Sequence, residues 1–490
     1  MKIGVIGAGI GGLATAARLA SRGHEVQVFE ANAYPGGKLS EIRLAGYRFD
    51  AGPSLFTMPH YVEELFKVAD VDIRDYFQYE ALPLICQYFW EDGTELSAYA
   101  DVEAFGQEIE KKLGVASNRL KKALHDSERK YDICGRIFLE KSLHRLDTWT
   151  NWEVLKAMLK IPTLDIFSSM DQVNRRQLKH PKLVQLFNRF ATYNGSSPYK
   201  APGLLNIIPH FEHGFGAFFP KGGMHAITQA IYRLALDKGV RFHFNQKVDQ
   251  IEVVNRRVEG LMVNGERLDF DQVVSNMDVY YTYKKLLPNV QHPEKTLRQD
   301  RSTSALIFYW GIQKTFPQLQ LHNILFSDDY AAEFKALNEG RLFDDPTVYI
   351  NITQKCQPED APEACENWFT MINVPHNNGQ DWTQLIKAAR ARMIQKISRI
   401  LNVDIAPLIA CEQILDPRTI ESKTSSYLGA LYGTSSNNRM AAFMRHPNFS
   451  RKIDHLYFCG GSVHPGGGIP LCLLSAKIVD ELLQEQTLTV

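Results

Sequence analysis

The chain has 490 residues, of which 44% are hydrophobic and 22% are charged, and its 55 basic and 55 acidic side chains give a formal net charge of zero. A chain of this length is too long for one hydrophobic core, so we expect two or three domains. Because there is no basic excess to neutralise phosphates, the composition gives no support to nucleic-acid binding, and we expect no nucleic-acid partner.

Cysteine usage and the N-terminus bear on the cellular compartment. The seven cysteines are scattered, odd in number and never spaced as C-x-x-C, which argues against a disulfide framework and against a metal site. The N-terminal MKIGVIGAG enters a strand pattern at once, and its glycines come too early for a signal peptide. Apolar runs such as Leu306–Ile312 are far shorter than the roughly 18 to 20 residues of a membrane-spanning helix. We therefore expect a cytoplasmic protein that associates with membranes only peripherally.

Residues 2–30 read as a single β-α-β unit. The sequence predicts strands at Lys2–Ile6 and Glu25–Phe29, which flank a helix at Gly12–Arg22 that is rich in Ala and Leu. Between about 102 and 191 the pattern becomes helical, with charged and aromatic side chains mixed. The chain is therefore expected to begin with an α/β unit, and a helical region follows it.

The second half of the chain is predicted to mix strands and helices. Helices are expected at Ala226–Lys238, where Gly239 suits the position just after the end, and at Trp382–Leu401. Strands are expected at Val240–Phe244, Val248–Val254, Arg257–Val263, Val273–Ser275 and the runs SALIFYWGI, TVYINIT and WFTMINV, with turns at Asn255–Arg256 and Asn264–Gly265. The last strand, His455–Phe458, runs into a glycine cluster and a closing helix.

The first glycine-rich loop has the pattern of a dinucleotide-binding site. Gly7–Gly12 satisfies G-x-G-x-x-G, follows a strand, opens a helix, and precedes Glu30 by eighteen residues. Gly7 allows the tight turn, Gly9 lets the backbone approach a pyrophosphate, and Gly12 lets helix and strand pack closely. The helix N-terminus favours phosphate, and Glu30 is placed to bind ribose hydroxyls. The alternative is a glycine-rich turn without a ligand.

Two further stretches indicate which dinucleotide is bound. Pro35–Lys38 (PGGK) and Phe49–Ser54 (FDAGPS) have no place in a plain NAD-binding fold, and they resemble the extended signature of the FAD-dependent amine oxidase superfamily. The resemblance implies FAD as the cofactor, with Lys38 facing its ribose–phosphate portion and Gly52–Ser54 near the flavin. No second G-x-G-x-x-G unit follows a strand, which argues against a separate nicotinamide domain.

Several blocks in order along the chain resemble the carotenoid desaturases of the bacterial phytoene-desaturase type. The blocks are FDAGPSLFTMP, ATYNGSSPYKAPG, FFPKGGM, VVSNMD and GGSVHPGGGIP. Lys38 and the run Ser54–Met58 are closest to the hydroxycarotenoid 3,4-desaturases. The resemblance implies that a hydride passes from an acyclic, 1-hydroxylated carotenoid to flavin N5 and that a carbon–carbon double bond forms. Alternatives are a phytoene or other acyclic carotene desaturase, a carotenoid isomerase, and a non-catalytic prenyl-binding escort of the same fold.

The resemblance also implies a fold class, α/β, with three parts. A Rossmann-type FAD-binding domain would comprise 1–75, 215–278 and 440–490, and an α+β substrate domain would comprise 76–101 and 279–439. Residues 102–214 would form a helical, membrane-facing subdomain.

Individual site residues keep alternative interpretations. Val248 matches the position whose backbone reads the adenine, or it is a core valine. Asn276 lies near the dinucleotide, or it ends a strand. His464 is a candidate general base, or it holds its glycine loop by hydrogen bonds, and no catalytic residue can be carried over from the family. The expected cofactor-binding residues are Gly7, Gly9, Ile10, Gly11, Gly12, Glu30, Ala31, Gly37, Lys38, Gly52, Pro53, Ser54, Val248, Asn276, Gly461, Gly468, Ile469 and Pro470.

The second glycine-rich stretch, Gly460–Lys477 (GGSVHPGGGIPLCLLSAK), raises the question of why a second such loop precedes a helix. The family resemblance places it beside the N-terminal unit, with backbone N–H groups against the flavin's pyrimidine end. Pro470 fits the first turn of the helix that begins at Ile469. The positive end of that helix would favour the negative charge that a flavin gains on hydride uptake.

A lysine-containing apolar stretch, Thr148–Met170, is a candidate membrane contact. Its larger apolar side chains are Trp149, Trp152, Leu155, Met158, Leu159, Ile161 and Phe167. A polyene substrate must come from a bilayer, so a helix that lies in the membrane interface would let the substrate enter the protein. The alternative is a helix packed on the domain core. The expected partners are an acyclic carotenoid, a membrane surface, and dioxygen or a quinone as the electron acceptor.

Overall fold

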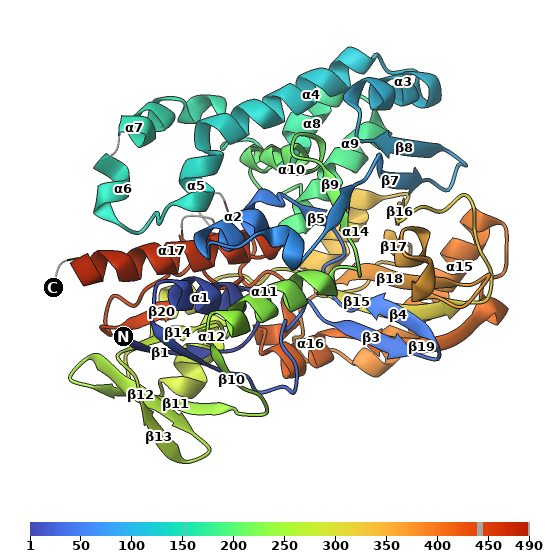
Figure 1. Cartoon of the computed structure of the whole chain (residues 1–490). Coiled ribbons are helices and arrows are strands. Elements are labelled where there is room, and N and C mark those ends of the chain that lie inside the picture. The colour runs from blue at the N-terminus through green and yellow to red at the C-terminus, as the bar shows by residue number, and fades with distance from the viewer. Residues whose placement is uncertain (151, 439–443, 489–490) are drawn as a thin grey trace.

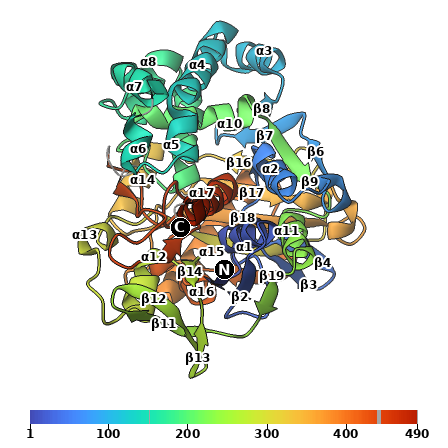
Figure 2. The same cartoon turned by 60° about the vertical axis from the view of Figure 1, so that its left-hand side comes forward.

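Two β-sheets form the framework of the protein, and a layer of helices covers one side of them (Figure 1). The computed structural model describes residues 1–150, 152–438 and 444–488. Figure 1 shows most strands of the two sheets in the lower part of the view and helices α3 to α10 in the upper part, where β7 and β8 reach the level of α9. The N-terminus lies close to the C-terminal helix in both views (Figures 1 and 2).

The first sheet is parallel and has five strands. In spatial order they are β10 (Arg241–His243), β2 (Glu25–Phe29), β1 (Lys2–Ile6), β14 (Gln272–Ser275) and β20 (Leu456–Phe458). The last strand of the chain therefore pairs in parallel with β14, two places from the first strand. Parallel strands are covered on both faces and need continuous apolar runs. The sequence of β1, KIGVI, meets this need, and Ile3 and Val5 are fully buried.

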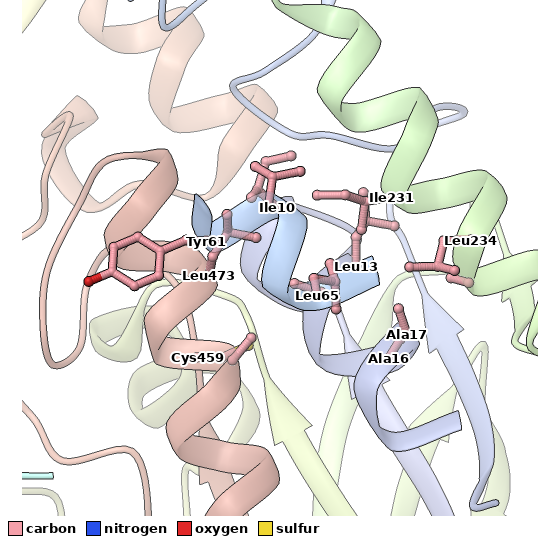
Figure 3. Close-up of a cluster of buried hydrophobic side chains, with 14 of the residues drawn as sticks. Ile10, Leu13, Ala16, Ala17, Tyr61, Leu65, Ile231, Leu234, Cys459 and Leu473 are labelled. Carbon is pink, nitrogen blue, oxygen red and sulfur yellow. The ribbon is translucent and has the colours of Figure 1, made fainter. Parts of the chain in front are cut away.

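Helix α1 (Ile10–Ser21) is the centre of the first core. Figure 3 shows it between α17 (Ile469–Leu488) and α11 (His225–Asp237), with α2 (His60–Val68) contributing Tyr61 and Leu65. Small residues such as Ala16 and Ala17 on α1 are fully buried, which lets the neighbouring helices approach it closely. The sequence predicts that this helix begins at Gly12, but in the structure it begins two residues earlier, at Ile10.

The other face of the parallel sheet carries a three-stranded antiparallel sheet. Its strands are β11 (Val248–Val254), β12 (Arg257–Val263) and β13 (Glu266–Asp269). The turns at Asn255–Arg256 and Asn264–Gly265 have positive φ at both residues, as two-residue hairpins require. Strand β13 was not predicted. Its exposed, charged sequence ERLD lacks the β-branched and aromatic residues on which strand predictions rest.

The second large sheet is mixed and has seven strands. In spatial order they are β19 (Ile409–Leu415), β15 (Ser304–Ile312), β18 (Glu366–Val374), β17 (Val348–Ile352), β16 (His322–Leu325), β7 (Leu84–Phe89) and β8 (Glu95–Tyr99). Alternate residues of β15 face opposite ways. Leu306, Phe308 and Trp310 pack in one core with α15 (Trp382–Leu401), so Ala305, Ile307 and Tyr309 turn to the other face.

Helices dominate residues 102–214, as predicted. They are α3 (Val102–Leu113), α4 (Ser117–Lys130), α5 (Arg136–Glu140), α6 (Leu146–Thr150), α7 (Trp152–Leu159), α8 (Met170–Leu178), α9 (Pro181–Asn188) and α10 (Pro209–His213). Figure 2 shows them stacked above the sheets. None of the helices in the described ranges is both long and apolar enough to cross a membrane.

Short elements complete the fold. Two small antiparallel sheets contain β3 (Glu41–Leu44) with β4 (Tyr47–Asp50), and β5 (Phe56–Thr57) with β9 (Ala217–Pro220) and β6 (Tyr79–Ala81). The remaining helices are α12 (Val279–Tyr281), α13 (Glu294–Leu297), α14 (Tyr330–Asn338) and α16 (Pro417–Thr424). The expected three-part division of the chain stays a prediction, and its boundary at residue 440 lies outside the described residues.

Helix α11 offers a matched test of the core around α1. Leu234 is fully buried against α1, whereas Leu236, on the same helix, is 45% exposed. We expect Leu234→Ala to lower the free energy of unfolding by about 2–5 kcal/mol, because it leaves a cavity in a packed core. Leu236→Ala should change it by no more than about 0.5 kcal/mol. Urea unfolding measures both, and equal effects would contradict the packing described for α11.

Candidate active site

One cavity, of about 870 Å³, connects the parallel sheet to the seven-stranded sheet. Its first part lies at the carboxyl ends of β1 and β2, where ligands bind in open parallel sheets. Its second part lies on the face of the seven-stranded sheet opposite α15. Side chains from β19, β15, β18, β17, β16 and β7 line this second part, so the cavity crosses almost the whole sheet.

The two glycine-rich loops meet at the side chain of Asn276. Its Nδ2 donates to the Cys459 carbonyl at 3.3 Å, and its backbone N–H donates to the carbonyl of Ile6 at 2.8 Å. A Cβ on Gly9 would lie 2.6 Å from Asn276 Oδ1, and a Cβ on Gly11 would lie 2.9 Å from the Cα of Gly460. The glycines thus leave room for each other's loop and for Asn276, a role that the motif alone does not suggest.

Two glycines of the first loop have the roles expected for them in its shape. Gly7 has φ +91°, in the region that favours glycine, at the tight turn after β1. A Cβ on Gly12 would lie 2.1 Å from the carbonyl oxygen of Gly7, so α1 could not pack this closely against the turn with any other residue. Gly12 does not line the cavity, and its role is the close packing of helix and strand.

Glu30 stands at the end of β2 with its carboxylate held in place. Oε2 accepts from the backbone N–H of Ala8 at 2.8 Å, and Oε1 accepts from the backbone and side-chain N–H groups of Asn32 at 2.8 and 2.7 Å. Oε1 thus accepts two hydrogen bonds, and Oε2, which accepts one, can accept a further one. Since Glu30 also lines the cavity, the carboxylate is fixed and available to the hydroxyl groups of a ligand.

Lys38 brings a positive charge to the wall of the cavity. Its Nζ donates to the Leu431 carbonyl at 2.9 Å. Burial lowers the pKa of Lys38, and the nearby Asp278 opposes that shift. An anionic ligand group in the cavity would stabilise the charged form of this amine.

A polar chain connects the loop after β4 to the seven-stranded sheet. The Tyr309 hydroxyl donates to the Ala51 carbonyl at 2.7 Å, and the Ser54 and Tyr349 hydroxyls are 2.7 Å apart. A Cβ on Gly52 would lie 1.9 Å from the Lys38 carbonyl oxygen, so the two predicted cofactor loops are in direct contact.

The structure brings nearly all of the expected cofactor residues to this one cavity. Those that line it are Gly7, Gly9, Ile10, Gly11, Glu30, Ala31, Gly37, Lys38, Gly52, Pro53, Ser54, Val248, Asn276, Gly461, Gly468, Ile469 and Pro470. The exception is Gly12, described above. That these residues bind a cofactor stays a prediction.

His464, the candidate general base, is not among the residues that line the cavity. The side chain is almost fully buried, and Nε2 lies 2.8 Å from the Lys141 carbonyl, to which it donates. Burial lowers the pKa of His464 to about 3, so the ring is neutral at neutral pH. These contacts fit the alternative interpretation, in which the ring holds its loop in place.

The wall formed by the seven-stranded sheet is apolar, and sequence reasoning did not single it out. Its side chains alternate along each strand, and they are Ala305 and Ile307 on β15, Phe369 and Met371 on β18, Leu415 on β19, Ile324 on β16 and Ile85 on β7. The apolar runs of β15, β17 and β18 predict strands, whereas β7, β16 and β19 were not predicted, and a continuous apolar run does not tell which face meets a cavity and which meets α15.

A polar cluster interrupts the apolar wall near β16 and β7. Arg189 donates to the Tyr88 hydroxyl at 3.0 Å and pairs with the Glu212 carboxylate at 3.3 Å, and the Tyr193 hydroxyl also donates to Glu212. Burial raises the pKa of Glu212, against the opposing effect of Arg189. His322 and Tyr349 line the same part of the cavity. No sequence motif pointed to these residues.

The donor set fits a long dinucleotide with an apolar partner beside it. A fixed carboxylate and two glycine loops lie at one part of the cavity, and an apolar wall lies at the other. The N-termini of α1 and α17 both open onto it through Gly11, Ile469 and Pro470, and helix N-termini favour negative charge. FAD has these features, since it carries ribose hydroxyls, a pyrophosphate and a planar redox ring.

Comparison with known proteins gives three results. Residues 10–479 match the family model described as flavin containing amine oxidoreductase. The chain is 53% identical, over 98% of each chain, to a 1-hydroxycarotenoid 3,4-desaturase of Flavobacterium sp. (strain P99-3). It is 34% identical to a 4,4'-diapolycopene oxygenase of Methylomonas sp., over 98% of this chain and 97% of the relative.

Among solved structures, a putrescine oxidase with bound putrescine is similar with a TM-score of 0.64. It covers 99% of both chains at 13% identity, which is evidence for the fold alone.

The contact between the glycine loops can be tested with Gly11→Ala. Alanine favours helix by about 1 kcal/mol over glycine, yet here its methyl group would collide with the backbone of Gly460. We expect a folded protein that loses most of its bound flavin, measured as the ratio of flavin to protein absorbance. Gly23→Ala is the control, because its added carbon meets open space although its φ of +83° costs stability, so it should keep its flavin. Full flavin content in Gly11→Ala would contradict the tight fit.

Proposed function

The chain belongs to the flavin-containing amine oxidoreductase family, and we propose that it is an FAD-dependent 3,4-desaturase of an acyclic, 1-hydroxylated carotenoid. The chain is an oxidoreductase and a relative of carotenoid desaturases. FAD as the particular flavin, and the substrate, are the parts proposed. The apolar wall that continues directly from the dinucleotide-like end of the cavity is the observation that carries the proposal.

The extent of that wall suits a polyene. The cavity spans the strands from β19 to β7, which are five inter-strand steps apart. At about 4.8 Å a step this is roughly 24 Å, the scale of an extended isoprenoid rather than of a small amine. The wall has aliphatic and aromatic side chains but few groups that could pair with a charge, so it favours a long hydrocarbon.

Each part of the cavity has a role in holding FAD under this proposal. Glu30 would accept hydrogen bonds from ribose hydroxyls, the Gly7–Gly12 loop and the start of α1 would hold the pyrophosphate, and the backbone at Val248 would contact the adenine. The loop that ends at Pro470 would hold the flavin end. A bound flavin would supply the acceptor for the hydride that leaves the substrate. The protein's own part is to exclude water and to orient the polyene.

No side chain of the chain is assigned as a general acid or base. His464 is buried and does not line the cavity, so it is not placed to carry that role. The cavity therefore supports catalysis mainly by orientation, with the redox chemistry carried by the cofactor. The relative that is an oxygenase shows that this scaffold supports more than one reaction, which is why the product must be measured.

The substrate's source is proposed to be a membrane surface. Trp152, Leu159 and Phe167 are 66%, 82% and 69% exposed, and Lys156 and Lys160 beside them are also exposed. Trp149 is instead packed near Ile137 and Val154, so the stretch divides into a packed and an exposed part. The side chains of Leu155 and Met158 lie outside the described residues. The electron acceptor is proposed to be dioxygen or a membrane quinone.

The central test is the reaction of the purified protein. We expect it to carry FAD, to be bleached anaerobically by a 1-hydroxylated acyclic carotenoid, and to yield a product lighter by two hydrogens per step. Mass spectrometry of the product distinguishes this from isomerisation, which leaves the mass unchanged. Conversion of phytoene with no conversion of the hydroxylated carotenoid would instead establish the acyclic-carotene alternative.

The exposed apolar side chains give a second test, by flotation with liposomes of neutral and acidic phospholipids. We expect the triple variant Trp152→Ser, Leu159→Ser, Phe167→Ser to bind liposomes more weakly by at least roughly three orders of magnitude. The three large apolar side chains together contribute about 4.5–9 kcal/mol when buried, and about 1.4 kcal/mol is a factor of ten in affinity. The control is Leu236→Ser, which alters an exposed apolar side chain elsewhere. Equal binding by both variants would contradict the membrane contact.

A further inference from the structure

His322 is a hydrogen-bond donor placed in the wall of a cavity built for hydrocarbon. It is the first residue of β16, it lines the cavity, and only 4% of it is exposed. Its Nε2 has no hydrogen-bond partner in the part of the chain that the structure describes. Buried polar groups are nearly always paired, so an unpaired one that faces a ligand cavity indicates a partner in the ligand.

The contacts of Nδ1 determine which ring nitrogen carries the proton. Asn351 Nδ2 lies 3.1 Å from the Leu321 carbonyl, which can only accept, so this side of the amide is the donor. The same Nδ2 lies 3.2 Å from Nδ1 of His322. The Tyr349 hydroxyl lies 2.8 Å from that Nδ1. Nδ1 is therefore the acceptor in the ring.

The ring of His322 is neutral at neutral pH. Burial, and then the charge of Arg189, lower the pKa of His322 to about 3. A neutral imidazole has a single N–H, and since Nδ1 accepts, that hydrogen is on Nε2. The wall thus presents one fixed N–H donor that needs an acceptor from the ligand.

The position of this donor matches the chemistry of the proposed substrate. In a 1-hydroxylated carotenoid that is desaturated between carbons 3 and 4, the hydroxyl oxygen is three bonds from carbon 3. That oxygen must then lie close to the flavin. His322 is connected through Tyr349 to Ser54, in the loop that is predicted to lie beside the flavin. The donor and the predicted redox end of the cavity are therefore joined by two hydrogen bonds.

We propose that His322 is a specificity-determining residue, whose Nε2–H donates a hydrogen bond to the substrate's 1-hydroxyl oxygen. Tyr349 and Asn351 are positioning residues that fix its tautomer. This inference rests on the proposed function and names the residue that recognises the substrate's hydroxylated end. A substrate without the hydroxyl would leave the buried N–H unpaired, which is how a polar site rejects an apolar analogue.

The test compares a 1-hydroxylated acyclic carotenoid with the same carotenoid lacking the hydroxyl. We expect the wild-type holoenzyme to prefer the hydroxylated compound in kcat/KM and in Kd, the latter followed by the shift of the polyene absorption. His322→Phe should reduce the preference by roughly 5- to 150-fold, the factor for an unpaired buried group. His322→Gln, which keeps an N–H donor, should retain part of the preference.

A matched control is His213→Phe. The two ring nitrogens of His213 are also buried and unpaired in the described structure, but the ring stacks on Phe105 and does not line the cavity. It should keep the wild-type preference. Flavin content and thermal midpoint of each variant report whether it is folded.

The outcomes separate this inference from the proposed function. If His322→Phe keeps the wild-type preference in Kd, or if the wild type binds the two carotenoids equally well, the inference is wrong. A third outcome is that the wild type binds the hydroxylated carotenoid more tightly, that His322→Phe does not, and that the wild type desaturates neither compound. In that case the inference stands and the proposed reaction fails.

Discussion

The packing of two glycine-rich loops around one asparagine is the contact on which the site depends. The loops are more than four hundred residues apart in the sequence, yet a Cβ on Gly11 would collide with Gly460, and one on Gly460 would collide with the Asn276 side chain. Asn276, at the end of β14, fills the space between them and donates to the second loop. The order β1-β14-β20 in the parallel sheet makes this meeting possible, because it brings the carboxyl ends of three distant strands to one edge.

A second constraint is the use of both faces of the seven-stranded sheet. One face of β15 is closed by α15 with Trp310 and Phe308 fully buried, which fixes the strand register. The opposite face is then left with Ala305 and Ile307, whose alternation makes an apolar wall without any dedicated motif. One face of the sheet thus packs on α15, and the other both packs against Phe49 of β4 and lines the cavity.

The helices and strands could be predicted from the sequence better than the part of the cavity that lies on the seven-stranded sheet. The strands at Lys2–Ile6, Val248–Val254 and Arg257–Val263 and the helix at Trp382–Leu401 have the predicted bounds, because their apolar periodicity is strong. The glycine motif and Glu30 could be placed because a short local pattern encodes that geometry. The polar cluster around Arg189 and His322 could not, since its members come from elements that only the tertiary fold brings together. The same reason explains the role of Asn276 in holding two loops, which no local pattern shows.

Arg445 gives the second glycine loop its rigidity and its charge. The guanidinium is buried, and among the described residues it donates to carbonyl oxygens, those of Tyr432 at 3.1 Å and Thr434 at 2.8 Å, with the carbonyl of Gly461 at 3.5 Å. Burial, and then the charge of Arg301, lower the pKa of Arg445 to about 10, so it remains protonated at neutral pH. A buried cation that has no carboxylate partner among these contacts raises the potential of the loop it supports. Together with the N-terminus of α17, which has the same sign, it makes this end of the cavity favourable for a ring that gains negative charge on reduction.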